Sequence, residues 1–365
     1  MPESAEQHLT DVPDVKTPEG AIRREDIISF DALFVSMMKC RRGVLWKPSV
    51  ASFYLNALER VAKLARDLET GTYAPRPPRH IKITYPKRRD GLCISFRDRV
   101  YQRSLNDLAL YPMVTRTFIY DNAACQKLKG SSFARERLKK FLRNHYHHYG
   151  NAGYAAHIDV SGYYPNMRHD VARETFRKRL PPDIYEMAAK ALDGQYAGDV
   201  GFSPGSQMVQ IAGVAVLDDL DHFIKEKLRV RHYLRYMDDF ILIGNDYAAL
   251  ADQVQAIVAE LGKLGFSASP KKTKIVPLRE GFKCLGFTFR LTDTGKVLLF
   301  IDPQNVKHER LKLRRLVRLS RAGVMPREHV GRCFQSWLAH AAQGNSFKLI
   351  ERMKTYYANL WRTPK

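Results

Sequence analysis

Two short apolar runs predict two strands on either side of a pair of acidic residues. Residues 232–245 read HYLRYMDDFILIGN, with aromatic and branched side chains before and after Asp238 and Asp239. Such side chains favour strands, and two strands that meet at Met237 predict a hairpin. A hairpin tip fixes two carboxylates yet leaves them open to solvent and a divalent cation, whereas burying both in a core would cost too much free energy. The alternative interpretation is a turn that merely favours Asp.

A third acidic residue follows another short apolar run. Residues 154–167 read YAAHIDVSGYYPNM, which predicts a strand that ends at Asp159. Strand-end Asp159 and hairpin Asp238 could hold two cations about 4 Å apart, an arrangement that activates an attacking hydroxyl and stabilises a leaving pyrophosphate. These residues indicate nucleotidyl transfer.

Helical spacing covers much of the remaining chain. Residues 30–68 are predicted to be helical, with one shared apolar face made by Leu55, Leu58, Val61, Leu64 and Leu68. Further helical stretches are residues 133–149, 211–228 and 247–262 and most of the chain after Asn305.

Two other segments have strand patterns. Residues 81–96 predict a hairpin whose tip, PKRRDG, is basic and suited to phosphate oxygens. Residues 282–289, FKCLGFTF, predict one strand interrupted by Gly286.

Composition narrows the class of protein. Sixty Lys and Arg against 38 Asp and Glu give a net charge of +22, which suits a polyanion such as nucleic acid. No apolar run approaches 18 residues, and we therefore expect a soluble, cytoplasmic protein without a membrane partner. The five Cys are scattered without a Cys-x-x-Cys pair, which argues against a disulfide framework or a zinc site.

The Tyr-Met-Asp-Asp hairpin, preceded by a strand with Asp-x-x-x-x-Tyr, resembles the active site of reverse transcriptases, and further matches in the family's order extend over roughly residues 80 to 350. The resemblance implies an α+β right-hand polymerase with an antiparallel palm sheet, acting as an RNA-directed DNA polymerase with Mg²⁺ (Mn²⁺ possible). The expected parts are a flexible lead-in and helical extension (1–78), fingers (79–150), palm (151–300, with a residual fingers segment near 170–200) and a helical thumb (301–365).

The resemblance also implies roles for individual residues. The metal ligands are expected to be Asp159, Asp238, Asp239 and the backbone carbonyl of Val160. Lys272 is expected to protonate pyrophosphate. The nucleotide-binding residues are expected to be Lys87 and Arg89 at the basic hairpin, Tyr164 beneath the sugar as a filter against a 2′-hydroxyl, and Gln210. The template and primer contacts are expected to be Lys127, Gly130, Gly205, Leu285 and Gly286.

One motif departs from most of the family. Retroviral, retron and group II intron enzymes usually carry Gln-Gly-x-x-x-Ser-Pro, whereas residues 204–210 read PGSQMVQ. This loop is closer to that of diversity-generating retroelement enzymes and some bacterial defence-associated reverse transcriptases. The implied partners are a template or noncoding RNA, the DNA product, deoxynucleotides, and an accessory protein or oligomer. The open alternatives are a polymerase-derived RNA-binding protein without catalysis, and a template-independent or protein-primed polymerase.

Overall fold

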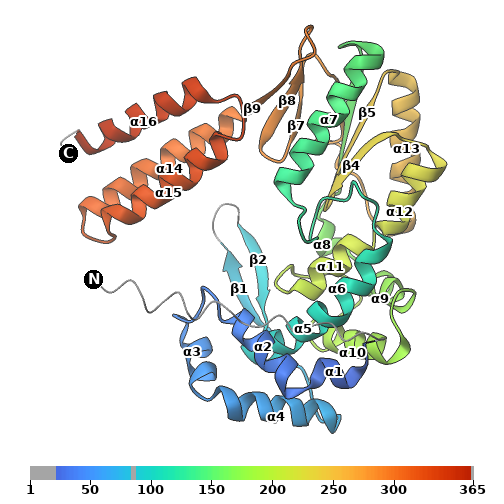
Figure 1. Ribbon diagram of the computed structural model, residues 1–365, viewed down its shortest axis with the longest axis vertical. Helices are drawn as coiled ribbons and strands as arrows, with labels where there is room; N and C mark the ends of the chain where they lie inside the picture. The colour runs from blue at the N-terminus through green and yellow to red at the C-terminus, as the bar shows by residue number, and fades with distance from the viewer. Residues whose placement is uncertain (1–21, 84–87, 363–365) are drawn as a thin grey trace. The chain divides into compact units, whose positions relative to one another are not determined.

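The computed structural model describes residues 22–83 and 88–362 (Figure 1). It confirms the expected α+β class, with all strand pairs antiparallel. The chain divides into two compact units. The first contains Met1–Leu128, Val160–Arg229 and Ile257–Ala268, and the second contains Lys129–Asp159, Val230–Ala256 and Ser269–Lys365. Within the described ranges, no helix combines the length and apolar character needed to cross a membrane.

The first unit is mainly helical, with one hairpin. Its helices are α1 (Arg24–Ile28), α2 (Phe30–Cys40), α3 (Pro48–Leu55), α4 (Ala57–Glu69), α5 (Phe96–Leu105), α6 (Tyr111–Val114), α8 (Tyr163–Asn166), α9 (His169–Arg177), α10 (Pro182–Asp193), α11 (Gln207–Ala215) and α12 (Asp218–His222). π-Helical turns cover Asn106–Leu110 and Phe223–Lys227, and a 3₁₀ turn covers Thr115–Thr117. Strands β1 (Arg79–Ile83) and β2 (Arg89–Cys93) form the predicted basic hairpin, but Arg89, Asp90 and Gly91, which the sequence predicts at its tip, are paired residues of β2.

The predicted apolar face of residues 30–68 is only partly correct. Three helices occupy the segment, and Asn56, with φ −115° and ψ 37°, separates α3 from α4. Leu55 lies before this break, and Leu58 lies in the first turn of α4 but outside the buried face of that helix. Leu55 and Leu58 are 82% and 67% exposed, whereas Val61, Leu64 and Leu68 of α4 are buried.

The second unit contains the predicted acidic hairpin and the strand that ends at Asp159. Its four-stranded sheet has the order β4 (His232–Tyr236), β5 (Asp239–Gly244), β3 (Tyr154–Asp159), β6 (Lys274–Pro277). Helix α7 (Ser131–Tyr149) packs on β4 and β5, and the Phe141 ring lies 5.2 Å from that of His232. Phe240 to Ile243 are all buried, which shows that β5 is covered on both faces and firmly supports the hairpin tip. Helix α13 (Tyr247–Lys263) follows β5 and continues into the first unit.

Residues 282–289 form a hairpin, and the prediction of one interrupted strand is wrong. Strands β7 (Phe282–Cys284) and β8 (Phe287–Leu291) pair directly, and β9 (Val297–Ile301) completes a three-stranded sheet. Leu285 and Gly286 are the two turn residues, with φ of +49° and +82°. Positive φ at both positions is the requirement of a type I′ turn, which reverses the chain where a kink was expected.

Three helices end the second unit, as the spacing after Asn305 predicts. They are α14 (Pro303–Arg321), α15 (Arg327–Ala341) and α16 (Phe347–Arg362). Helices α15 and α16 pack on α14, as Figure 1 shows. Their shared core includes Leu313, Val330 and Phe334, and the Phe334 ring stacks on Tyr357 at 4.5 Å.

Candidate active site

Strand register brings the predicted acidic residues together in the second unit. Asp159, the last residue of β3, is the cross-strand partner of Asp239, the first residue of β5. Directly opposed residues of an antiparallel pair have Cβ atoms about 5 Å apart on the same face. Asp238 lies in the turn that precedes β5, where Met237 has a φ of +56°. Three carboxylates from segments about 80 residues apart therefore gather at one end of the sheet, as the sequence predicts.

The surroundings of Asp238 disfavour its charged form. Burial is the largest cause that raises the pKa of its carboxyl group, and the charges of Asp239 and Asp159 raise it further. A hydrogen bond from its own backbone N–H and the charge of Lys272 act in the opposite direction. Burial disfavours any charge at this position, whereas the neighbouring carboxylates of Asp239 and Asp159 favour a positive charge beside it.

Lys272 supplies such a charge to Asp159. Its Nζ atom lies 2.7 Å from Oδ1 and 2.9 Å from Oδ2 of Asp159, and this carboxylate raises the pKa of the lysine. Lys272 therefore lies beside the acidic residues with a predicted metal ligand as its partner, and its role in protonating pyrophosphate stays a prediction. The side chain is 65% exposed, which leaves it free to move on its long stem.

His157 is a site residue that sequence reasoning missed. Its Nε2 atom lies 2.9 Å from Oδ1 of Asp239. His157 stands two residues before Asp159 on β3, and alternate residues of a strand point to the same face. That spacing is the signal that could have identified His157 as a neighbour of the acidic cluster.

Arg235 was also missed, and it lies beneath the acidic turn. It is the largest fully buried side chain among the described residues, and its Nη1 donates a 3.0 Å hydrogen bond to the carbonyl oxygen of Met237. A charged side chain is rarely buried without a specific role in hydrogen bonding. Arg235 therefore fixes the left-handed turn that carries Asp238.

The acidic cluster suits Mg²⁺ by its donor atoms. Within the described ranges, no three acidic, His or Cys side chains are already arranged around one metal position. Lys272 engages Asp159, and His157 engages Asp239. Carboxylate oxygens are the ligands that Mg²⁺ prefers, and the ammonium group of Lys272 shows that Asp159 stabilises a cation beside the cluster. The residues fit the metal, provided that Lys272 moves away from Asp159.

Val160, the predicted backbone ligand, forms an isolated bridge with Ala268. The flanking hydrogen bonds run from Ser161 N–H to the Ser267 carbonyl, and from Ser269 N–H to the Asp159 carbonyl. In this pattern, the polar backbone groups of Val160 itself point away from the bridge. The bridge therefore does not engage the carbonyl oxygen of Val160.

Two predicted nucleotide-binding residues lie in the first unit. Tyr164 belongs to the short helix α8 and is half-buried, with its ring 5.4 Å from that of Tyr163. Gln210 was expected in a loop, but it lies in α11, and its Nε2 donates to the carbonyl oxygen of Pro204 at 3.5 Å. The helix starts earlier than expected because the Ser206 side chain caps it by accepting a hydrogen bond from Val209 N–H.

The loop before α11 packs on the basic hairpin. Leu92 N–H donates to Ser203 Oγ at 3.0 Å, and a Cβ atom added at Gly205 would lie 2.8 Å from the Leu92 carbonyl oxygen. Only glycine allows this approach without displacement of the loop. Lys87 lies outside the described residues. Arg89 is the first residue of β2, and only the backbone of Arg89 is described.

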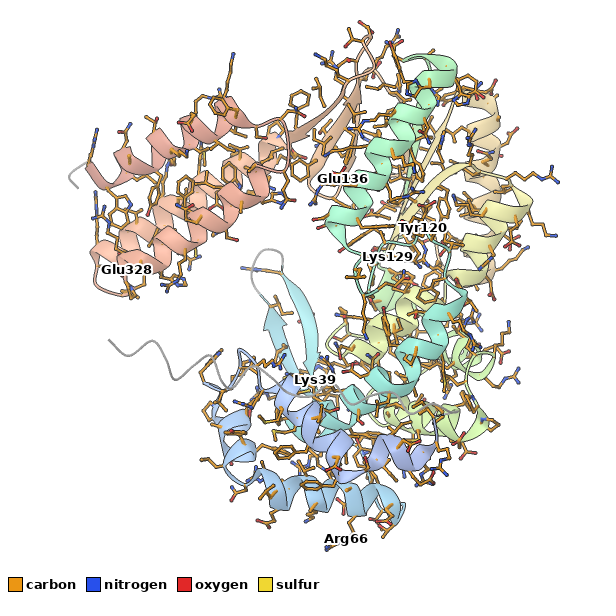
Figure 2. The ribbon with its side chains drawn as sticks, in the orientation of Figure 1. Lys39, Arg66, Tyr120, Lys129, Glu136 and Glu328 are labelled. Carbon is orange, nitrogen blue, oxygen red and sulfur yellow. The ribbon has the colours of Figure 1, made fainter. Side chains whose placement is uncertain are left out.

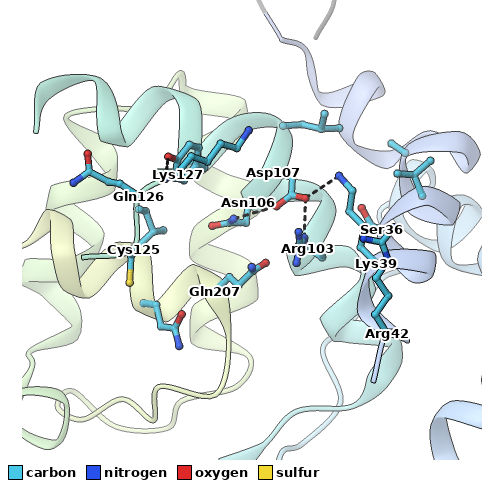
Figure 3. Close-up of a pocket in the computed structure, with 16 residues that line it drawn as sticks. Ser36, Lys39, Arg42, Arg103, Asn106, Asp107, Cys125, Gln126, Lys127 and Gln207 are labelled. Carbon is cyan, nitrogen blue, oxygen red and sulfur yellow. Dashed lines mark hydrogen bonds and ion pairs between the residues drawn. The ribbon is translucent and has the colours of Figure 1, made fainter. Parts of the chain in front are cut away.

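A cavity of about 980 Å³ in the first unit contains Lys127, a predicted template contact (Figure 3). Lys127, Gln207 and Gln210 line it, and Lys127 N–H donates to the hydroxyl oxygen of Tyr111 at 2.6 Å. The other basic residues of its lining are Lys39, Arg42 and Arg103.

Asp107 is the one acidic residue of that lining. Lys39, which extends from α2 (Figure 2), lies 3.3 Å from Asp107 Oδ2, and Arg103 lies 2.7 Å from the same oxygen. One carboxylate opposes four basic side chains, so the lining keeps a net positive charge.

The remaining predicted contacts are in the second unit. Gly130 is the residue before α7 and has a φ of +152°. Leu285 and Gly286 form the β7–β8 turn, where a Cβ atom at Gly286 would lie 3.5 Å from His340 of α15. Burial and, less strongly, the charge of Asp239 raise the pKa of the neighbouring Cys284 thiol. The turn is therefore close enough to the acidic cluster for Asp239 to affect it.

The mixture of helices and antiparallel sheets is that of the right-hand polymerase fold. Residues 86–289 match the family of reverse transcriptases (RNA-dependent DNA polymerase), and this is more than half of the chain. The chain belongs to that family. None of the curated proteins compared with it matches in sequence.

Solved telomerase structures match this chain over part of their length. The apo telomerase of Candida tropicalis truncated from its C-terminal domain gives a TM-score of 0.47 and 14% identity, over 62% of this chain and 55% of that chain. Apo telomerase from Candida tropicalis gives 0.47 and 12%, over 63% and 49%. Telomerase from Candida albicans in complex with the TWJ fragment of telomeric RNA gives 0.49 and 14%, over 88% and 61%. The chain spans less than two thirds of each of these proteins.

Proposed function

We propose that this protein is an RNA-directed DNA polymerase that joins deoxynucleotides on an RNA template, with Mg²⁺ at Asp159, Asp238, Asp239 and the carbonyl of Val160. The observation that carries the proposal is the pairing of Asp159 with Asp239 across β3 and β5, next to an Asp238 whose surroundings favour a bound cation. Bound Mg²⁺ would activate the primer hydroxyl and neutralise the charge that develops on the phosphates.

The chain's own residues prepare this site for the reaction. His157 and Arg235 hold Asp239 and the acidic turn in place. Lys272 carries a proton beside the acidic cluster and, after release from Asp159, is suited to donate it to the leaving pyrophosphate. The basic β1–β2 hairpin, through Lys87 and Arg89, is assigned to the triphosphate.

Template and primer are assigned to separate surfaces. The cavity that contains Lys127 combines basic side chains for phosphates with the amides of Gln207 and Gln210 for base edges, which suits a single-stranded template. The sharp turns at Gly130 and Gly205 allow close approach of a nucleic-acid backbone. The Leu285–Gly286 turn is assigned to the primer end, and α14 to α16 to the backbone of the duplex.

The test is extension of a DNA primer on an RNA template with deoxynucleotides and Mg²⁺. We expect synthesis by the wild type and a loss of roughly 10³-fold or more in Asp238→Asn, because charge stabilisation at a reacting phosphate dominates the rate. Asp252→Asn, an exposed acid of α13, is the matched control and keeps full activity. Omission of the RNA provides a second arm. Synthesis without it would indicate a template-independent enzyme, and no synthesis by the wild type with Mg²⁺ or Mn²⁺ would indicate an RNA-binding protein without catalysis.

We place the biological role among systems that copy a dedicated RNA, namely phage defence with a companion noncoding RNA or a diversity-generating retroelement. The support is the PGSQMVQ motif, whose Ser206 caps α11. Sequencing of RNA that co-purifies with the protein separates the two roles. A transcript that matches a template repeat and a neighbouring variable gene indicates diversification, and a noncoding RNA without such a repeat indicates defence.

A further inference from the structure

Gly213 lies in the middle of the buried helix α11, where glycine is an unfavourable choice. A glycine inside a helix costs about 1 kcal/mol relative to alanine. Gly213 is buried, and its neighbours Ala212 and Val214 are fully or almost fully buried as well. A feature of the surrounding structure must therefore require the absence of a side chain at this position.

The aromatic ring of Tyr164 provides that requirement. A Cβ atom added at position 213 would lie 3.0 Å from Oη, 3.1 Å from Cε1 and 3.2 Å from Cζ of Tyr164. These separations are shorter than normal contacts between carbon atoms, which optimally lie about 3.5 to 4.0 Å apart. The outer end of the Tyr164 ring thus rests directly on the backbone of α11 at Gly213.

The backbone around Tyr164 is held in place, and the ring is the part that can move. The carbonyl oxygen of Tyr164 accepts a 2.8 Å hydrogen bond from Phe202 N–H. The preceding Tyr163 donates its hydroxyl to the carbonyl oxygen of Gly213, and its ring lies 4.9 Å from that of Phe266. A methyl group at position 213 would therefore displace the Tyr164 ring away from α11.

We infer that Gly213 is a positioning residue for sugar selection, because it sets how closely the Tyr164 ring packs against the backbone of α11. This inference rests on the proposed polymerase function, in which Tyr164 lies beneath the sugar of the incoming nucleotide and excludes a 2′-hydroxyl. With glycine at position 213, the Tyr164 ring lies as close to the backbone of α11 as atomic contact permits. A methyl group that moves the Tyr164 ring away from α11 narrows the space for the sugar. The narrower space excludes a ribonucleotide more strongly than a deoxynucleotide.

The test compares single-nucleotide insertion by the wild type and Gly213→Ala. We expect kcat/KM for a deoxynucleotide to fall by roughly fivefold, which corresponds to about 1 kcal/mol. The value for the matching ribonucleotide should fall further, so that discrimination between the two sugars increases. Gly262→Ala is the control, because this helical glycine of α13 has no atom within 4 Å of an added Cβ, and both rates should remain at the wild-type values.

A double-mutant cycle with Tyr164→Phe separates positioning from a general effect on folding. The hydroxyl oxygen is the Tyr164 atom closest to the added methyl group, and its removal should reduce the effect of Gly213→Ala on both rates. A fall in thermal stability with unchanged sugar discrimination would overturn the inference, as would an equal effect in both backgrounds.

Two further results keep this inference distinct from the proposed function. Tyr164→Ala should relax discrimination against ribonucleotides. If the wild type synthesises DNA but Tyr164→Ala does not change sugar selection, the filter and the role of Gly213 are both wrong, and the polymerase assignment remains. If the wild type makes no DNA at all, the proposed function itself fails.

Discussion

Lys272 lies with its ammonium nitrogen 2.7 Å and 2.9 Å from the two carboxylate oxygens of Asp159. The same oxygens are the expected ligands of a divalent cation, so lysine and metal compete for them. The lysine side chain is 65% exposed and can move away, whereas the Asp159 side chain is only 11% exposed, so a metal ion would have to compensate this buried carboxylate once the lysine leaves. Lys272 can therefore stabilise Asp159 before the metal binds and then remain nearby, where the pyrophosphate departs.

Lys272→Ala tests both roles. Without the competing ammonium group, half-maximal activity should occur at a lower Mg²⁺ concentration. Loss of the proton donor should lower the maximal rate by roughly 10² to 10⁴-fold, the usual contribution of general acid catalysis. Primer extension over a range of Mg²⁺ concentrations measures both quantities. Lys271→Ala is the matched control, since this neighbouring lysine is equally exposed. An unchanged Mg²⁺ requirement would contradict competition, and an unchanged maximal rate would contradict proton donation.

Asp238→Asn is expected to stabilise the metal-free protein while it removes activity. The pKa of Asp238 is raised above its ordinary value of 3.8, mainly by burial. Folded Asp238 therefore holds its proton more tightly than the unfolded chain does, and the wild type loses stability as the pH rises from 3.8 through the raised pKa. Asparagine does not ionise and avoids this loss. The free energy of unfolding of the metal-free protein should rise by about 1 kcal/mol at neutral pH, as is common when a destabilising functional residue is replaced.

Urea denaturation without metal at several pH values measures this difference. The advantage of Asp238→Asn should shrink as the pH falls toward 3.8, whereas Asp252→Asn should give no pH-dependent difference. Mg²⁺ should stabilise the wild type more than Asp238→Asn, because the cation offsets the repulsion among the carboxylates. Equal stability of the variant and the wild type at all pH values would show that Asp238 is not under electrostatic strain.

The sequence predicts those parts of the site that depend on local patterns. The apolar runs and the residue types around Asp159 and Asp238 are local, and they correctly predict a strand end and a hairpin tip. The register that opposes Asp159 to Asp239 depends on pairing between distant segments, which the pattern alone does not determine. The burial of Arg235 was equally beyond prediction, because arginine is usually exposed.

Two errors have identifiable local causes. The start of α11 was placed too late because Ser206 was not recognised as a helix cap, although its hydroxyl accepts from Val209 N–H. The β7–β8 turn was missed because leucine is an unusual first residue for a type I′ turn, where asparagine followed by glycine is preferred. In the first case a signal was overlooked, whereas in the second the sequence departs from the usual rule.

That departure at Leu285 gives another prediction. Leucine in the left-handed conformation costs about 1 to 2 kcal/mol, whereas asparagine tolerates this conformation. Leu285→Asn should therefore raise the free energy of unfolding by up to about 1 kcal/mol, the scale of such backbone effects. If the leucine side chain supports the primer end, the same variant should require more primer for half-maximal extension. Denaturation and primer titration measure the two effects. Normal primer use by a stabilised variant would show that Leu285 does not contact the primer.

Arg235 should be essential to the stability of the acidic turn. Arg235→Leu removes the buried donor to the Met237 carbonyl and leaves that acceptor without this bond, which costs about 1 to 3 kcal/mol per buried group. Arg290→Leu, at an exposed position of β8, is the matched control and should change stability little. Arg235→Lys keeps the charge but presents a single nitrogen in place of a planar fork. We expect it to fold, to need more Mg²⁺ for half-maximal activity and to keep the wild-type affinity for primer, because the acidic turn alone is displaced. Full activity of Arg235→Lys at the wild-type Mg²⁺ requirement would show that the arginine supports the fold without positioning Asp238.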